Sequence, residues 1–250
     1  MKTKALIISI KSTELSKSEI NIITKGKPWG VILFKRNLKS YNQIKNLTFK
    51  IRSLTKNKNF PIIIDEEGKS VSRLLNIINH DVSANFFGNL YIKNKSFCFK
   101  IYNHYINSLS KILKDLGFNI NTIPVLDVLR FNTNMIIGNR SFSKSKKIVN
   151  ELGFLTIEYL KRNKIAGVIK HIPGHGAALT DSHKKMPIVS MSLKKLNHLD
   201  FYAFKSLNSQ FAMTAHILYK KIDKKNVATF SKKIIREVIR KSIGFKGILI

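Results

Sequence analysis

Cysteine, acidic residues and long apolar runs are all scarce in this 250-residue chain. A single cysteine, Cys98, excludes an internal disulfide and suits a reducing cytoplasm. We expect its side chain to be a small buried hydrophobe. No run of about 18 apolar residues occurs, which excludes a membrane-spanning helix. The apolar run at 5–10 is too short for a signal peptide core, so we expect a cytoplasmic protein.

Acidic residues number only 14 against 45 lysines and arginines, which gives a net charge of +31. Such a charge raises the hypothesis of a basic nucleic-acid-binding protein. The basic residues are mostly lysine and are spread along the whole chain, together with abundant asparagine and isoleucine. We interpret this pattern as the compositional drift of an AT-rich genome. It predicts salt-sensitive, sequence-blind attraction to nucleic acid, without a specific nucleic-acid partner or a membrane partner.

Proline and glycine are also few, at 5 and 12 residues, and no linker rich in them divides the chain. We therefore expect one domain over residues 1–250. Seven short apolar runs, rich in β-branched residues, alternate with amphipathic helical stretches, as in a parallel α/β fold. The predicted fold is a (β/α)8 TIM-barrel type that is incomplete, with about seven strands. The predicted strands are 5–10, 30–34, 61–65, 119–127, 166–171, 211–216 and 247–250.

Polar residues stand where several of these runs end, namely Asp65, Asp127, Lys170, His171 and His216. In parallel α/β folds, and in barrels above all, catalytic groups gather at the carboxyl ends of the strands. A charge at such a position can also simply cap the next helix. Five positions on four different runs favour a shared site.

The stretch "KHIPGHGAALTDSH" at 170–183 holds three of the 7 histidines. His171 and His175 have the four-residue spacing of a helical zinc pair, and His216 keeps a metal site open as an alternative. However, Pro173 and the glycines around His175 forbid a regular helix there. The helical spacing therefore loses its meaning.

Proton transfer explains the end of this stretch better than metal binding does. Asp181 and His183 lie two residues apart on the loop that leaves the strand. An aspartate near an imidazole fixes its tautomer and favours its protonated form. A histidine tuned in this way can give a proton to a leaving oxygen and later take one from water.

"KHIPGHG", "DSH" and "MP" together resemble the "KHFPGHG…DSH…LP" signature of family 3 glycoside hydrolases, in particular the bacterial β-N-acetylglucosaminidases. Five further blocks resemble that family in the same order along the chain. They are "GVILFKRN" at 30–37, "IDEEGKSVSRL" at 64–74, "PVLDV" at 124–128, "IGNRSF" at 137–142 and "MTAHILY" at 213–219. The resemblance implies a β-N-acetylhexosaminidase that releases terminal β-linked GlcNAc from cell-wall muropeptides during peptidoglycan recycling. It implies a retaining mechanism and no metal or organic cofactor.

The resemblance also implies residue roles. His183 and Asp181 correspond to the acid/base dyad, which the family carries on a mobile loop. His175 is expected to shape its loop, and His216 to support the sugar-binding residues from behind. The sugar subsite is expected to contain Asp65, Arg73, Arg140, Lys170 and His171.

The chain departs from the family pattern in two places. The family's aspartate nucleophile follows the strand that corresponds to "GFKGILI", so it would lie beyond Ile250. We therefore expect a C-terminally truncated enzyme that needs a complementing C-terminal fragment, or a non-catalytic GlcNAc-binding remnant. In addition, Lys69 replaces a glycine of the family, and strain is expected if that turn needs a positive φ.

Overall fold

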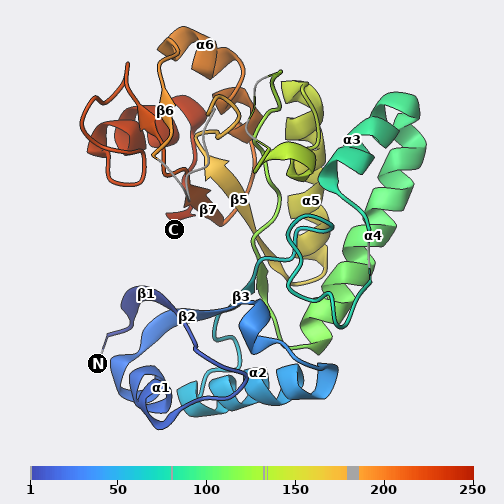
Figure 1. Cartoon of the computed structure of the whole chain (residues 1–250), viewed down its shortest axis with the longest axis vertical. Helices are drawn as coiled ribbons and strands as arrows, with labels where there is room; N and C mark the ends of the chain where they lie inside the picture. Colours follow the sequence, from blue (N-terminus) through green and yellow to red (C-terminus); the bar gives the residue numbers. More distant parts are fainter. Residues whose placement is uncertain (1, 80, 132, 134, 179–185) are drawn as a thin grey trace.

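The structure is a computed structural model that describes residues 2–79, 81–131, 133, 135–178 and 186–250. Seven strands form one sheet in chain order, and every neighbouring pair is parallel. The sheet curls into an incomplete barrel with helices along its outer side (Figure 1). This confirms the predicted fold. The strands are β1 (Lys4–Ser9), β2 (Pro28–Leu33), β3 (Ile62–Ile64), β4 (Ile120–Asn121), β5 (Ala166–Ile172), β7 (Phe211–Thr214) and β9 (Ile248–Leu249).

The long helices form where apolar residues recur at helical spacing. In α2 (Tyr41–Thr55), Ile44, Leu47 and Ile51 are buried, and the Ser40 side chain caps the first turn by accepting the Gln43 N–H. α4 (Lys95–Asp115) and α5 (Lys146–Arg162) bury similar stripes and pack against each other. The shorter helices are α1 (Lys17–Asn21), α3 (Ala84–Lys93) and α6 (Leu193–His198).

Two features of the fold differ from the prediction. The last amphipathic stretch is π-helical over Ile234–Ile243 rather than α-helical, although it still buries Ile234, Val238 and Ile239. β6 (Ile188–Val189) and β8 (Leu218–Tyr219) form a separate two-stranded parallel sheet. Two residues are too few to give a strand signal in the sequence.

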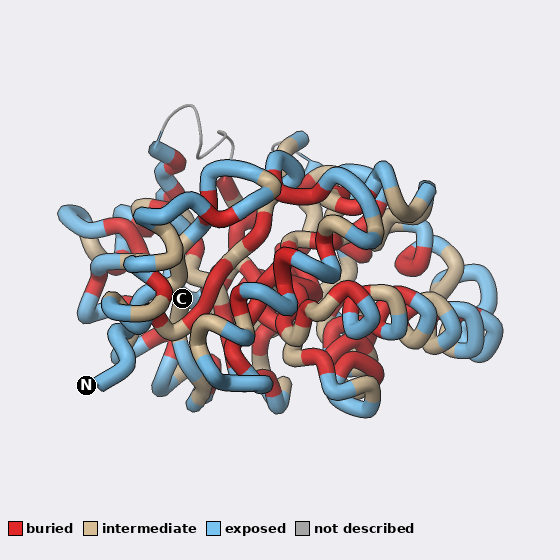
Figure 2. The backbone as a smooth tube through the Cα atoms, turned by 90° about the horizontal axis from the view of Figure 1, so that it is seen from below, coloured by how far each residue is buried: buried red, intermediate tan, exposed pale blue. Residues whose placement is uncertain are grey.

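The buried residues form a large cluster between the sheet and the helices, and a smaller one that contains Ile63, Ile120, Val168 and Phe211 (Figure 2). Within the described ranges, β1 and β9 each pair with one neighbour only, so both are edge strands. Leu6 of β1 is 55% exposed. The barrel is therefore open between these two strands.

Cys98 lies in α4 and is fully buried. Its Sγ donates to the carbonyl oxygen of Phe87 at 3.3 Å, and burial raises the pKa of the thiol to about 11. The expectation of a small buried side chain is confirmed. Among the described helices, none combines the length and the apolar character needed to cross a bilayer.

Candidate active site

Three polar residues meet at the carboxyl ends of β3, β4 and β5. Asp65 and Lys170 were predicted from the sequence, and Thr122 was not. Asp65 directly follows β3, Thr122 directly follows β4, and Lys170 lies in β5. Lys170 Nζ donates to Thr122 Oγ1 at 2.7 Å, and the Thr122 hydroxyl donates in turn to Asp65 Oδ1. Lys170 Nζ also lies 3.4 Å from the same carboxylate oxygen. Arg73 Nη2 lies 3.4 Å from Asp65 Oδ2, on the other side of the carboxylate.

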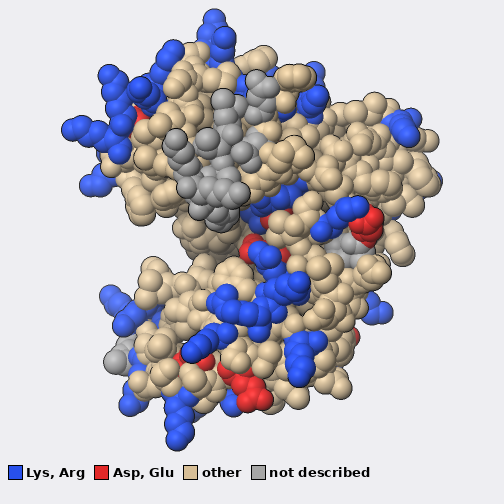
Figure 3. Space-filling view, viewed as in Figure 1, with Lys and Arg blue, Asp and Glu red and all other residues tan. Residues whose placement is uncertain are grey.

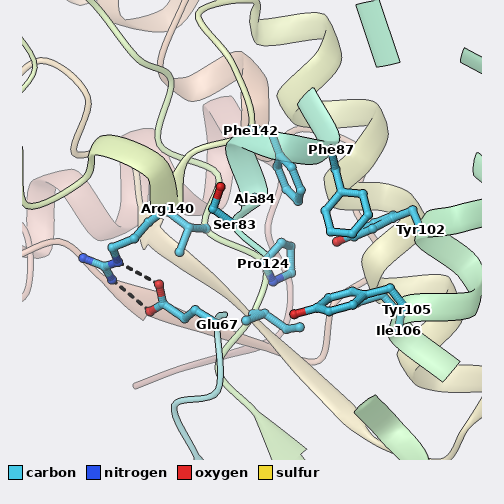
Figure 4. Close-up of a pocket in the computed structure, with 12 residues that line it drawn as sticks. Glu67, Ser83, Ala84, Phe87, Tyr102, Tyr105, Ile106, Pro124, Arg140 and Phe142 are labelled. Atoms are coloured by element: carbon cyan, nitrogen blue, oxygen red, sulfur yellow. Dashed lines mark hydrogen bonds and ion pairs between the residues drawn. The ribbon is translucent and has the colours of Figure 1, made fainter. Parts of the chain in front are cut away.

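Arg140 joins this group through a residue that the sequence did not single out, Glu67. Lys170 Nζ lies 2.5 Å from Glu67 Oε1. Arg140 grips the same carboxylate with two hydrogen bonds, from Nε to Oε2 at 2.7 Å and from Nη2 to Oε1 at 2.9 Å (Figure 4). Four predicted residues, Asp65, Arg73, Arg140 and Lys170, therefore belong to one charge network.

Both carboxylates of the network are held in the ionised form. Burial raises the pKa of Asp65, but the nearby charge of Lys170 and the Thr122 hydrogen bond outweigh it, so the pKa lies below its ordinary value. Burial likewise raises the pKa of Glu67, and Lys170 and Arg140 bring it below its ordinary value. Anions and cations in one recess offer both acceptors and donors, which is the chemistry that hydroxyl-rich ligands need. Figure 3 shows acidic and basic side chains meeting in the hollow at the middle of this face.

His171 is fixed by Asp127 next to this network. His171 Nδ1 lies 2.7 Å from Asp127 Oδ2. Asp127 Oδ1 also accepts the backbone N–H groups of His171 at 3.3 Å and of His175 at 2.6 Å. Burial raises the pKa of Asp127, but the charge and hydrogen bond of His171 lower it to about 2. A permanent carboxylate therefore sets the orientation of the imidazole.

The loop after β3 reaches the site because a glycine permits its turn. Gly68 has a φ of 121°, and a Cβ there would meet the Val82 carbonyl oxygen at 2.4 Å. Lys69 is not among the described residues with positive φ, so the expectation of strain at Lys69 is wrong. Its backbone N–H donates to Val82, and its Nζ pairs with Asp81 at 2.7 Å.

The two remaining histidines of the prediction lie in different surroundings. His175 is buried, its ring is edge-on to that of His171, and its backbone bond to Asp127 fits a loop-shaping residue. His216 is exposed, and its ring lies edge-on to Phe230 with 5.9 Å between ring centres. His216 lies two residues beyond the end of β7 at Thr214, and its expected supporting role stays a prediction.

The predicted acid/base pair, Asp181 and His183, lies outside the described residues. Sequence reasoning missed Glu67 and Thr122. A signal for Glu67 was present, because it stands in the same resembling block as Asp65 and Arg73. Thr122 had no comparable signal, since a threonine after an apolar run is an ordinary strand residue.

Comparison with known families supports the resemblance to family 3 glycoside hydrolases over nearly the whole chain. The glycosyl hydrolase family 3 N-terminal domain matches residues 2–250. A beta-hexosaminidase of Methylobacillus flagellatus is 30% identical over 247 residues, covering 98% of this chain and 70% of that protein. A beta-hexosaminidase of Neisseria meningitidis serogroup A is 29% identical over 248 residues, covering 98% of this chain and 68% of that protein.

Solved structures of family 3 enzymes match the fold of this chain as well. The crystal structure of NagZ from Neisseria gonorrhoeae, in complex with N-trifluoroacetyl-D-glucosamine, matches with a TM-score of 0.92 at 28% identity. That match covers 99% of this chain and 73% of NagZ. A family 3 beta-N-acetylglucosaminidase of Paenibacillus matches with a TM-score of 0.88 at 27% identity, over 97% of this chain and 46% of that one. Sequence and fold together show that this chain belongs to glycosyl hydrolase family 3 and that residues 2–250 correspond to the N-terminal domain of that family.

Proposed function

We propose that this chain is the sugar-binding and proton-donating part of a β-N-acetylhexosaminidase. Its substrate is a terminal β-linked GlcNAc of a muropeptide or a related glycoside, in the cytoplasm, as part of peptidoglycan recycling. The single observation that carries the proposal is the network of Asp65, Arg73, Arg140 and Lys170 at the carboxyl ends of the strands. Relatives named beta-hexosaminidase and a NagZ complex with a glucosamine derivative support the choice of sugar.

Each group of the network has a part in holding the sugar. Ionised Asp65 accepts hydrogen bonds from vicinal hydroxyls, and the guanidinium and ammonium groups donate to hydroxyl and amide oxygens. His171, oriented by Asp127, adds one further polar contact. Held at several points, the sugar presents its glycosidic oxygen in one direction only, and such positioning lowers the activation barrier of the reaction.

His183, assisted by Asp181, is the proposed acid/base group. It protonates the leaving oxygen in the first step and removes a proton from water in the second. A retaining reaction also needs a carboxylate nucleophile on the opposite face of the sugar. The family pattern places this aspartate directly after the strand that corresponds to β9. A segment that continues the barrel from β9 would supply it, in the same polypeptide or as a complementing C-terminal fragment.

A chromogenic β-GlcNAc glycoside tests this proposal. We expect the 250 residues alone to give no turnover above background. Turnover should appear when they are co-expressed with the part of the Methylobacillus relative that they do not match, and His183→Ala should abolish it. Turnover by the 250 residues alone would contradict the need for an added nucleophile. Turnover unaffected by His183→Ala would contradict the dyad.

A second candidate is a non-catalytic GlcNAc-binding protein. The observation that favours it is that the sugar-binding network lies entirely within the 250 residues, independent of any nucleophile. Calorimetry with GlcNAc, together with the absence of turnover in every complemented form, would distinguish it from the enzyme. In both cases Asp65→Ala should remove binding.

A further inference from the structure

Glu67 is one of the most deeply buried charged side chains of the network. Its side chain is 4% exposed, and that of its partner Lys170 is 3% exposed. On one side it meets the Arg140 guanidinium, and on the other lies a small cavity lined by the aromatic rings of Phe87, Tyr102 and Phe142 (Figure 4). An apolar wall lowers the local dielectric, which strengthens every charge interaction beside it.

The two carboxylates of the network are engaged very differently. Glu67 is 2.5 Å from Lys170 and is held bidentately by Arg140. Asp65 is 3.4 Å from both Lys170 and Arg73, and its side chain is 14% exposed. Oδ1 of Asp65 accepts the Thr122 hydroxyl, but the longer contacts to the two cations leave Asp65 with lone pairs for a ligand, whereas the short contacts commit Glu67 to Lys170 and Arg140. The geometry thus separates a ligand-facing anion from a cation-holding one.

The network uses only some of the N–H groups of Lys170 and Arg140. Lys170 uses two of its three N–H groups on Glu67 and Thr122, and its third reaches Asp65 only at 3.4 Å. Arg140 gives Nε and one N–H of Nη2 to Glu67, and one N–H of Nη1 to the carbonyl oxygen of Ile136. Within the part of the chain that the structure describes, one hydrogen on each terminal nitrogen of Arg140 has no acceptor. Lys170 can likewise exchange its 3.4 Å contact with Asp65 for a hydrogen bond to a ligand.

We propose that Glu67 is a positioning residue for the sugar subsite: it holds Lys170 and Arg140 side by side so that their remaining N–H groups serve the ligand. Two cations at such close quarters repel each other in a buried site unless an anion lies between them. Without Glu67 the two side chains would separate or turn away. This inference rests on the proposed function, because it assumes that Lys170 and Arg140 contact the sugar.

Four variants of the 250-residue chain test the proposal by calorimetry with GlcNAc. Glu67→Gln keeps the shape of the side chain and removes its charge, so we expect binding to weaken at least tenfold. Glu67→Asp keeps the charge but is too short to reach both cations, and we expect at least fivefold weaker binding. Glu151→Gln is the matched control. It removes the charge of a carboxylate that pairs with Lys95 at 2.7 Å outside the network, so binding should stay within about twofold.

Asp65→Asn, the fourth variant, distinguishes a failure of the proposed sugar binding from a failure of the positioning role of Glu67. If Asp65→Asn removes binding while both Glu67 variants bind like wild type, sugar binding stands and the positioning role is overturned. If Asp65→Asn binds like wild type, the proposed function itself fails. Should Glu67→Gln not fold, Glu67→Asp decides, because it retains the buried negative charge.

A double-mutant cycle with Lys170→Met distinguishes positioning from a general loss of structure. If Glu67 acts through Lys170 and Arg140, the loss of affinity in Glu67→Gln/Lys170→Met is smaller than the product of the two single losses. Losses that simply multiply would mean that Glu67 acts independently of Lys170, and would overturn the proposal.

Discussion

His171 and Asp127 meet at the end of β5, where the imidazole Nδ1 lies 2.7 Å from the carboxylate Oδ2. The other carboxylate oxygen accepts the backbone N–H of His175. One buried anion therefore fixes both a candidate sugar-binding ring and the loop that follows it. When His171 is neutral, this contact places its proton on Nδ1 and leaves Nε2 as an acceptor.

Removing this anion should cost both stability and binding. In Asp127→Ala the buried N–H of His175 loses its acceptor, so we expect the free energy of unfolding to fall by about 3 kcal/mol. Asp127→Asn keeps an acceptor and should lose about half as much. Urea denaturation measures the first effect, and GlcNAc calorimetry should show weaker binding in both variants. An Asp127→Ala chain as stable as wild type would show that the contact contributes nothing.

Asp200 predicts a pH dependence of stability. Burial raises the pKa of Asp200 to about 6, despite its contact with Arg130. In the unfolded chain an aspartate titrates near about 3.9, so the folded protein binds this proton more tightly. The contribution of Asp200 to the free energy of unfolding therefore increases as the pH falls from about 7 to about 4. It is lost as the pH rises through about 6.

Asp200→Asn imitates the protonated carboxyl and should remove this dependence. Relative to wild type, the variant should be more stable at pH 7 by about 1–3 kcal/mol, and that advantage should shrink by pH 4. Urea denaturation of both proteins at a series of pH values provides the measurement. An advantage that stays constant between pH 4 and 7 would contradict a raised pKa at Asp200.

Gly176 predicts a steric requirement in the loop after His175. A Cβ at this position would lie 2.0 Å from the carbonyl oxygen of Val128, so Gly176→Ala forces the backbone apart. We expect a loss of about 1–3 kcal/mol in the free energy of unfolding, and weaker GlcNAc binding. Gly26→Ala is the control, because its Cβ would meet only Ile22 Cγ2 at 3.7 Å. Equal stabilities of the two variants would refute the steric argument.

The open edge of the barrel predicts concentration-dependent association. Leu6 is exposed on β1, an edge strand, and edge strands pair readily with other chains. Leu6→Lys should lower association in light scattering, with the free energy of unfolding changed by less than about 0.5 kcal/mol. Leu75→Lys replaces a leucine that is 47% exposed outside any strand and should leave association unchanged. Equal effects of both changes would point to charge rather than to the strand edge.

The strands could be located from the sequence because a buried parallel strand has a simple signature. "GVILF" and "AGVIKH" are short, β-branched and bounded by breaks, and they became β2 and β5. "NINTIPVLD" was expected to be longer than β4, which ends at Asn121. The segment after β4 still accepts hydrogen bonds from β5, from Val168 N–H to Ile123 and from Lys170 N–H to Pro124, although Pro124 itself has no N–H to donate.

The site could be predicted only in part, for a physical reason. Asp65, Arg73, Arg140 and Lys170 stood in recognisable blocks, and the structure brings them together. Glu67 stood beside them, but its role depends on Arg140, which is 73 positions further along the chain. Glu66 binds the backbone N–H groups of Arg73 and Leu74 instead, and the sequence alone does not specify which of the two glutamates meets Arg140.

The burial of Cys98 has a practical consequence. A thiol with a pKa of about 11, enclosed within α4, contains almost no thiolate at neutral pH and reacts slowly with maleimides while the chain is folded. A cysteine introduced at an exposed position would then be the one fast-reacting sulfur. A fluorophore attached there could report on movements of a chosen segment, without any need to mutate the native residue.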